Sequence, residues 1–268
     1  MTQKKQAVAP PTLPIGREAF EKNEKTTVYW LGGAGALINS RGTLLMVDPV
    51  LEGFEMPQLR PAPLSCAQVP ALDGVLITHS DGDHYSEASC LGLAPVCPAF
   101  HATLYGAGLM KKAGLPALGH PIGDSFSLGR VRVRLTPADH CWQQDQPEPR
   151  GYVFRPEDCC GFWLETPDGT IWAPGDSRLM EEHLSLPEPD LIFFDFSEDS
   201  WHIGLGGAQK LAETYPRSRL ILWHWGTVDA PDLAPFNGDP QEILRRIPNP
   251  ERAFILAPGE AFSLRPLS

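Results

Sequence analysis

The sequence predicts an α/β fold made of two halves, each a group of strands followed by helices. Short runs of apolar and β-branched residues, separated by glycine-rich turns, alternate with longer segments of helical character. Neither a long linker nor a convincing short repeat interrupts this order. A single domain that contains two sheet-plus-helix halves therefore fits the chain best.

The first half opens as a β-meander. We expect its strands at residues 26–31, 36–39, 43–47 and 75–77. No long helix follows the glycine turn at 32–35. We therefore interpret this turn as a tight connection between paired strands and not as a phosphate-binding loop. Helices are expected at 86–91 and 99–113, the second ending before Gly114. Four prolines within 51–70 predict an irregular loop that overhangs the site.

The second half repeats the pattern. We expect strands at residues 125–126, 131–135, 161–166, 170–173, 191–195, 220–227, 253–257 and 261–264. Pro167-Asp168-Gly169 predicts a hairpin turn. A helix at 207–215 ends before Pro216, and Asp239 with Pro240 is typical of the start of a last helix.

The first 25 residues differ from the rest. They are rich in Lys, Pro and Gln and lack periodicity, which predicts an extension that is loosely packed or disordered. The folded domain is therefore expected to span residues 26–268.

Composition limits the class of protein. Hydrophobic residues make up 42% and charged residues 21% of the 268 residues, which is ordinary for a globular protein. A net charge of -11 without a basic stripe argues against nucleic acid as a partner. No run approaches the roughly 20 apolar residues of a membrane span, and residues 1–14 lack the apolar core of a signal peptide. Six sparse cysteines, two of them vicinal at Cys159 and Cys160, fit reduced thiols, so we expect a cytoplasmic protein.

The most informative stretch follows the predicted strand at 75–77. His79, Asp81, Asp83 and His84 place two imidazoles and two carboxylates within six residues. Both are ligand types for zinc or manganese, and Gly82 permits the tight turn that lets them converge. A solvated acidic turn is the alternative, but it leaves the paired histidines unexplained.

Further polar residues end other predicted strands. His140, Asp176 and His224 each follow an apolar run in the second half. Asp48 follows the strand at 43–47, and two interpretations stay open for it: a turn cap before Pro49, or an acceptor that orients a ligand histidine. His101, His120 and His183 lack such a setting, so we expect surface or helix positions for them.

Taken in order, these motifs resemble the metallo-β-lactamase superfamily. Asp48, the stretch from His79 to His84, His140, Asp176 and His224 match its five motifs in sequence. The resemblance covers roughly residues 26–264 and implies a four-layered αβ/βα sandwich with a metal site at the edge of two sheets. Residues 30–35 and 223–227 resemble the branch that contains L-ascorbate-6-phosphate lactonase and N-acyl-phosphatidylethanolamine phospholipase D.

The resemblance also implies a set of ligands for two divalent ions. His79, Asp81 and His140 would hold the first ion. Asp83, His84 and His224 would hold the second, with Asp176 bridging the two. The usual motif has His where this chain has Asp81, and a carboxylate moves the preference toward manganese or iron without forbidding zinc.

The expected activity is hydrolysis of an ester, lactone or phosphodiester bond in a small molecule, through a metal-bridging hydroxide. Asp83 could accept the proton of the nucleophile, and either His202 or a metal-bound water could protonate the leaving group. A cap on the following helix is an alternative role for His202. An iron-dependent oxygenase or oxidoreductase on the same fold is the main rival, and a metal-binding module without turnover is another.

Aromatic residues accompany the predicted site. Tyr85, Trp142, Trp201 and Trp225 each lie within a residue or two of one of its members, which predicts an aromatic-walled pocket, with core packing as the alternative for each ring. Two cations in an otherwise acidic protein favour an anionic small molecule as substrate. The sequence leaves the oligomeric state open.

Overall fold

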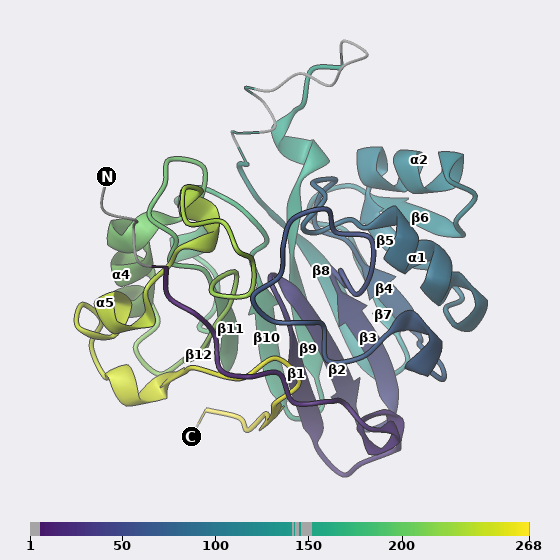
Figure 1. Cartoon of the computed structure of the whole chain (residues 1–268), viewed down its shortest axis with the longest axis horizontal. Helices are drawn as coiled ribbons and strands as arrows, with labels where there is room; N and C mark the ends of the chain where they lie inside the picture. The colour runs from purple at the N-terminus through teal and green to yellow at the C-terminus, as the bar shows by residue number, and fades with distance from the viewer. Residues whose placement is uncertain (1–5, 141, 143–144, 146–151, 268) are drawn as a thin grey trace.

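The computed structural model describes residues 6–140, 142, 145 and 152–267. Within this part of the chain, two mixed sheets of seven strands each lie between helices (Figure 1). The predicted α/β class and the four-layered sandwich are confirmed.

The first sheet contains most of the N-terminal half. Its order is β14 (Ala261–Ser263), β1 (Thr26–Gly32), β2 (Gly35–Ser40), β3 (Thr43–Val47), β4 (Gly74–Leu76), β5 (Phe100–Thr103) and β6 (Ala117–His120). The strands from β14 to β3 pair antiparallel, and those from β3 to β6 pair parallel.

The second sheet is built in the same way from the C-terminal half. Its order is β13 (Ala253–Phe254), β12 (Arg219–Leu222), β11 (Leu191–Phe194), β10 (Gly169–Ala173), β9 (Cys160–Thr166), β8 (Val131–Pro137) and β7 (Ser125–Leu128). Here β7 to β10 pair antiparallel, and β10 to β13 pair parallel. Each half of the chain thus supplies one sheet, apart from β14, which joins the first sheet from the C-terminal end.

The helices form the two outer layers. Figure 1 shows α1 (Glu87–Leu93) and α2 (Leu104–Lys112) on one side of the strands and α4 (Gly204–Thr214) and α5 (Pro240–Leu244) on the other. Short 3-10 turns occupy Arg17–Phe20, Cys66–Gln68, Ala94–Val96, Pro156–Asp158, Glu182–Leu184, Ala234–Phe236 and Pro250–Arg252. None of the described helices is both long and apolar enough to cross a bilayer.

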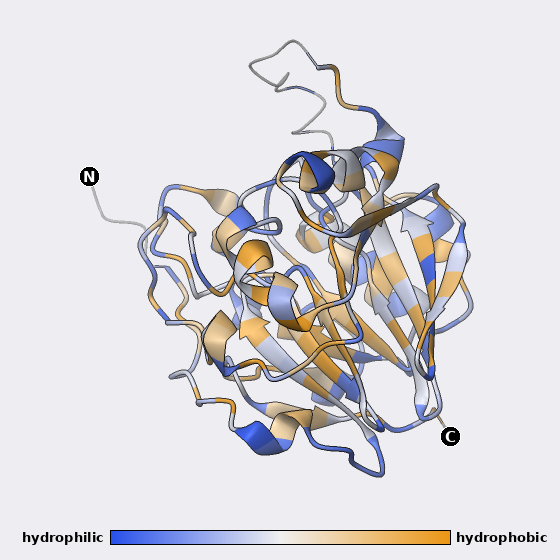
Figure 2. Cartoon of the chain, turned by 90° about the vertical axis from the view of Figure 1, so that its right-hand side faces the viewer, coloured by the Kyte–Doolittle hydropathy of each residue, from blue (hydrophilic) through white to orange (hydrophobic). Residues whose placement is uncertain are grey.

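The core follows from the two-residue period of the strands. In β3, Leu45 and Val47 join the cluster that lies between the sheets, whereas Leu44 and Met46 join the cluster beneath α1 and α2. Both faces of this strand are therefore buried, which explains its uninterrupted apolar sequence. Figure 2 shows apolar residues concentrated along the strands of the interior.

Most predicted elements are present, but one helix was assigned too long. Residues 100–103 form the buried strand β5, and only the remainder of the predicted helix at 99–113 is helical. Thr103 ends the strand and also caps α2, because its hydroxyl accepts a hydrogen bond from the Gly106 amide at 3.2 Å. With no glycine or proline between strand and helix, the boundary is invisible to a turn-based prediction.

The expectation of a loosely packed N-terminal extension is wrong for residues 6–25. Ala9, Ile15 and Phe20 are buried in the cores. The Ala9 amide donates to the carbonyl of Gly226 at 2.9 Å, and the Leu13 amide donates to that of Pro258 at 2.8 Å. The segment therefore crosses both halves of the fold: Ala9 and Leu13 lie against the C-terminal half, and Ile15 and Phe20 join the core of the N-terminal half (Figure 1). The same expectation for residues 1–5 falls outside the described residues.

Asp168, in the turn between β9 and β10, ties this hairpin to the first sheet. Its Oδ2 accepts hydrogen bonds from the Thr26 amide at 2.8 Å and from Arg41 Nε at 2.9 Å. The hydrogen bond from Arg41 is the main reason why the pKa of this carboxyl falls to about 2. One ionised side chain thus joins the ends of both sheets.

We expect Asp168→Asn to lower the free energy of unfolding at pH 7 by about 1 kcal/mol, because the charge that Arg41 and Thr26 meet is lost. A lowered folded-state pKa stabilises above the unfolded value of roughly 3.9 and ceases to do so as pH falls toward 2. Urea unfolding from pH 7 to pH 2 should show the two proteins converging in acid. Glu165→Gln, which alters an exposed pair with Arg132, is the control and should have little effect. A penalty for Asp168→Asn that stays constant with pH would contradict this account.

Candidate metal centre

The seven predicted ligands and Asp48 all follow the carboxyl ends of strands and meet at one edge of the sandwich. Asp48 follows β3; His79, Asp81, Asp83 and His84 follow β4; His140 follows β8; Asp176 follows β10; and His224 follows β12. Because β3 and β4 are parallel in one sheet and β10 to β12 are parallel in the other, each sheet delivers its residues to a single edge.

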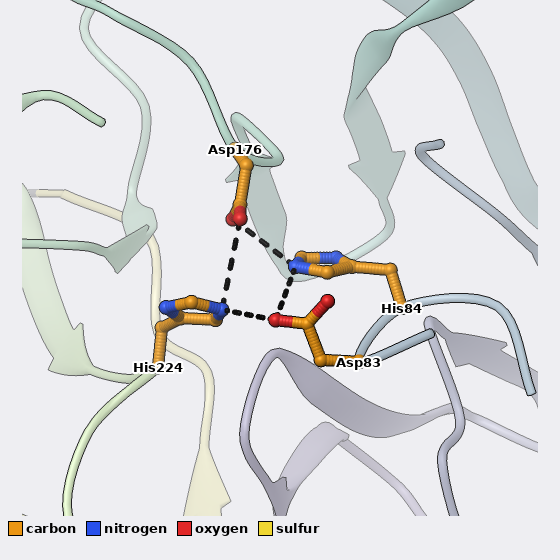
Figure 3. A group of neighbouring side chains, drawn as sticks. All are labelled: Asp83, His84, Asp176 and His224. Carbon is orange, nitrogen blue, oxygen red and sulfur yellow. Dashed lines mark hydrogen bonds and ion pairs between the residues drawn. The ribbon is translucent and has the colours of Figure 1, made fainter. Parts of the chain in front are cut away.

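The first group of candidate ligand atoms comes from Asp83, His84, Asp176 and His224 (Figure 3). Each residue offers one ligand atom, and these atoms all lie within 4.8 Å of one another. His84 Nε2 lies 3.1 Å from Asp176 Oδ1. His224 Nε2 lies 3.2 Å from Asp83 Oδ2 and 3.6 Å from Asp176 Oδ2. Two histidines and two carboxylates from both halves of the chain thus converge on one point.

The second group consists of His79, His140 and Asp176, again within 4.8 Å. Asp81 adjoins it, because its Oδ2 lies 2.9 Å from His140 Nε2 and 3.6 Å from His79 Nε2. Asp176 belongs to both groups. All seven predicted ligands therefore lie together, arranged as two ligand sets with one shared carboxylate.

Asp48 orients a histidine rather than only capping a turn. It is fully buried, and His84 Nδ1 donates to its Oδ2 at 2.8 Å. The Thr78 amide and hydroxyl also donate to this carboxylate, at 2.8 and 2.6 Å. These bonds fix the imidazole of His84 with Nε2 facing the centre.

Two further orienting groups escaped the sequence analysis. The hydroxyl of Thr78 accepts a hydrogen bond from His79 Nδ1 at 2.9 Å. The carbonyl of Pro235 accepts one from His224 Nδ1 at 3.2 Å. Thr78 is adjacent to the ligand stretch and could have been suspected, whereas a backbone carbonyl carries no sequence signal. In both cases the outer nitrogen is engaged and Nε2 faces the cluster.

The donor atoms fit bound cations. The Nε2 atoms of His79 and His84 are buried and make no hydrogen bond, although a buried polar atom without a partner is costly. A cation at the centre of each group would supply the bond that each Nε2 atom lacks, including that of His84, whose Nε2 now lies 3.1 Å from Asp176 Oδ1. Imidazole and carboxylate donors suit zinc, manganese and iron.

The carboxylates and imidazoles of the cluster shift one another's pKa values. Burial alone would raise the pKa of Asp176, but His224, His84 and His202 outweigh it and hold that pKa well below its usual value. Burial would likewise lower the pKa of His84, but Asp176, Asp83 and Asp48 raise it far above its usual value. Burial dominates at His79 and lowers its pKa, so this imidazole is neutral and available as a ligand.

His202 lies between two carboxylates. Its Nε2 is 2.7 Å from Asp176 Oδ2, and its Nδ1 is 2.9 Å from both oxygens of Asp199. The helix-cap alternative is wrong, because α4 has its N-cap at Ile203 and no side chain caps it. Asp199 was missed by the sequence analysis, since only the fold places its carboxylate on the far side of this imidazole.

The other three histidines lie apart from the cluster, but the expectation of surface or helix positions is only partly right. His101 is buried in β5, and His120 is half-buried in β6, so both are strand residues. The two rings contact through a hydrogen bond of 3.0 Å between His101 Nδ1 and His120 Nε2. His183 does lie in a 3-10 turn, yet it is fully buried.

The predicted aromatic wall is present in part. Trp142 and Trp201 line a cleft beside the cluster, with ring centroids 6.4 Å apart. Trp225 instead stacks on Trp30 in the core, with ring centroids 6.1 Å apart. Tyr85 packs against the hydrophobic core beneath α1 and α2. For these last two rings, core packing is the correct interpretation.

Comparison with known proteins identifies the family. The family described as "Beta-lactamase superfamily domain" matches residues 43–225. The chain therefore belongs to this superfamily. A UPF0173 metal-dependent hydrolase from Myxococcus xanthus (strain DK1622) is 33% identical over 259 residues, which cover 90% of this chain and 84% of that protein. Another from Anaeromyxobacter sp. (strain K) is 27% identical over 253 residues, with 88% and 86% covered. Within the superfamily, the chain thus belongs with the UPF0173 metal-dependent hydrolases.

Solved structures share the fold at low identity. Igni18, a metallo hydrolase from Ignicoccus hospitalis, has a TM-score of 0.69 at 16% identity, covering 90% of this chain and 99% of its own. An isothiocyanate hydrolase from Delia radicum gut bacteria has a TM-score of 0.68 at 16% identity, with 88% and 99% covered. CmlA, a diiron β-hydroxylase from Streptomyces venezuelae, has a TM-score of 0.64 at 15% identity, with 91% and 54% covered.

We expect Asp48→Asn to weaken metal retention about 10- to 100-fold, because an amide cannot accept all the hydrogen bonds that now orient His84. Competition with a chelator, followed by elemental analysis, measures this change. Asp73→Asn is the matched control: its carboxylate accepts a hydrogen bond from the Leu44 amide in the same sheet at 2.7 Å, without an imidazole partner. Equal metal retention in both variants would contradict the orienting role of Asp48.

Proposed function

We propose that this protein is a binuclear metal hydrolase that cleaves an ester, lactone or phosphodiester bond in a small molecule. The observation that carries the proposal is the pair of ligand groups that share Asp176. Each group offers three or four side-chain donors, which is the number that a catalytic ion usually takes from a protein.

The assignment of ligands follows the two groups. His79, Asp81 and His140 would hold one ion, Asp83, His84 and His224 would hold the other, and Asp176 would contact both. Two bound divalent cations supply an activated water and polarise the oxygen of the scissile bond. Asp81 adds a hard carboxylate where the superfamily usually has histidine, which favours manganese or iron over zinc.

Asp83 and His202 are the candidates for proton transfer. Both line the cleft, so both can reach a bound substrate. Asp83 would accept the proton of the nucleophile. His202 would donate a proton to the leaving group, and its contacts to Asp176 and Asp199 hold Nε2 at the cluster.

The rival chemistry is oxygenation at iron. Its support is the fold shared with the diiron β-hydroxylase, and fold alone does not decide chemistry. The hydrolase names of relatives along nearly the whole chain favour hydrolysis. The resemblance to the lactonase and phospholipase D branch suggests lactones and phosphodiesters as substrates to test first.

Metal analysis tests the binuclear site. Purified or reconstituted protein should contain about two divalent ions per chain.

Asp176→Ala should reduce hydrolysis more than Asp48→Ala, because a shared ligand contacts both ions and an orienting group contacts neither. Steady-state rates on a panel of lactones, esters and phosphodiesters measure the order. An absence of metal after reconstitution, or the reverse order of the two variants, would refute the assignment.

A second test separates binding from chemistry. His202→Ala should lower kcat by about 100-fold or more while the metal content stays the same, since His202 contacts a ligand without completing either group. Asp199→Asn should have a smaller effect in the same direction. His120→Ala, at a half-buried histidine outside the cluster, should leave both quantities unchanged. Loss of metal in His202→Ala would assign this residue to metal binding instead.

A further inference from the structure

The cleft that opens on the metal cluster has a volume of about 320 Å³ and walls that are mostly apolar. Its floor contains the acidic and imidazole groups of the cluster. Its walls are formed by Phe54, Met56, Trp142, Trp201, Leu233 and Phe236. These come from four separate segments, after β3, β8, β11 and β12, so the apolar surface is assembled by the fold.

Part of this wall is held rigidly from behind. Phe54 and Met56 pack against a small buried cluster of Val228, Ala230 and Phe236, separate from the two main cores. The loop at 51–70 and the loop after β12 therefore brace each other beside the site.

Other parts of the wall leave apolar surface open to water. Leu233 is 47% exposed and Trp142 is 36% exposed, which is high for side chains of this size. Exposed apolar surface that lines a cleft is typical of a binding site.

The described residues of the apolar walls include no lysine or arginine that could pair with a charged group on the ligand. Among the described residues that line the cleft, Asp81, Asp83 and Asp176 are acidic, and none is lysine or arginine. Arg60 lines a second chamber of about 150 Å³ that also touches Asp83 and His224. The Nε of that guanidinium donates to the carbonyls of Ala9 and Pro10 at 2.7 and 3.0 Å, so backbone oxygens already engage it.

From the apolar walls and the lack of lysine or arginine among the described residues that line the cleft, we propose that the walls bind an uncharged apolar group attached to the scissile bond. The substrate class is then an ester or lactone of an apolar carboxylic acid, in place of the anionic molecule expected from the sequence. This inference rests on the proposed function, because the cleft adjoins the same cluster. The apolar group would cover Leu233 and lie against the rings of Trp142 and Trp201.

Acyl-chain dependence tests the inference. For 4-nitrophenyl esters, each added CH2 that is fully buried should raise kcat/KM by up to about fourfold. We expect the hexanoate to exceed the acetate by at least about 10-fold. It should also exceed the hemisuccinate, which has a similar length and a negative charge. Equal rates for acetate and hexanoate, or preference for the hemisuccinate, would overturn the proposal.

Variants connect this preference to the wall. Leu233→Ala should reduce the ratio of hexanoate to acetate rates several-fold, and Leu233→Lys should raise the relative rate of the hemisuccinate. Leu118→Ala, at a leucine of 50% exposure on β6, is the matched control and should leave the ratios unchanged. Unchanged ratios in both Leu233 variants would place the preference elsewhere and overturn the assignment of this wall.

A binding measurement separates this inference from the proposed function. Asp83→Asn should still bind 1-hexanol more tightly than ethanol or succinate. Tryptophan fluorescence measures this binding, and the fluorescence response should be abolished when Trp142 and Trp201 are both changed to phenylalanine. Selective 1-hexanol binding in a protein that hydrolyses none of the esters would support the apolar cleft and refute the hydrolase proposal. Ester hydrolysis without selective 1-hexanol binding would support the hydrolase proposal and refute the apolar cleft.

Discussion

Two seven-stranded sheets pack face to face, and this packing determines where every residue of the site lies. Apolar side chains from both sheets fill the space between them, so the edges of the sheets are held in register with each other. The loops that carry polar residues leave the strands at one shared edge. A disturbance of the core beneath that edge would move Asp83 relative to Asp176, even though neither residue would change its own contacts with its strand.

The site also contains backbone strain. Asp48 and His224 have φ values of 42° and 62°, in the left-handed region that non-glycine residues rarely adopt. Such a conformation costs on the order of 1–3 kcal/mol per residue and persists only where surrounding contacts impose it. The hydrogen bonds of Asp48 to Thr78 and His84 supply that constraint, as do those from the amide of His224 to Gly33 and from its ring to Pro235. Within the site, the two strained residues are the candidate ligand His224 and the carboxylate that orients His84; Arg41 and Asn249 adopt the same backbone region outside the site.

The sequence was sufficient for most strands and for the polar residues at their ends, because alternation, glycine turns and ligand types are local signals. It did not predict β5 or β6. It could not reveal contacts between distant segments. Phe54 reaches the cleft only when its loop packs on Phe236, which lies far along the chain. His101 was misplaced for a similar reason: its burial depends on Phe126 from the other sheet, whose ring stacks on it at 4.4 Å. Packing between segments that are distant in the sequence thus determines these contacts, which the local sequence pattern does not encode.

The N-terminal segment has a consequence for the order of folding. The side-chain amide nitrogen of Gln6 donates to the carbonyl of Val228 at 2.7 Å, across a sequence separation of 222 residues. The side-chain oxygen of Gln6 accepts a hydrogen bond from the backbone amide of Ala230. This N-terminal segment therefore depends on partners in the C-terminal half of the sequence. Contacts of such separation slow folding, and they cannot form on a nascent chain until its C-terminal half has emerged. The loop that carries His224 would thus be among the last regions to become rigid, and an incomplete chain would lack the means to close it.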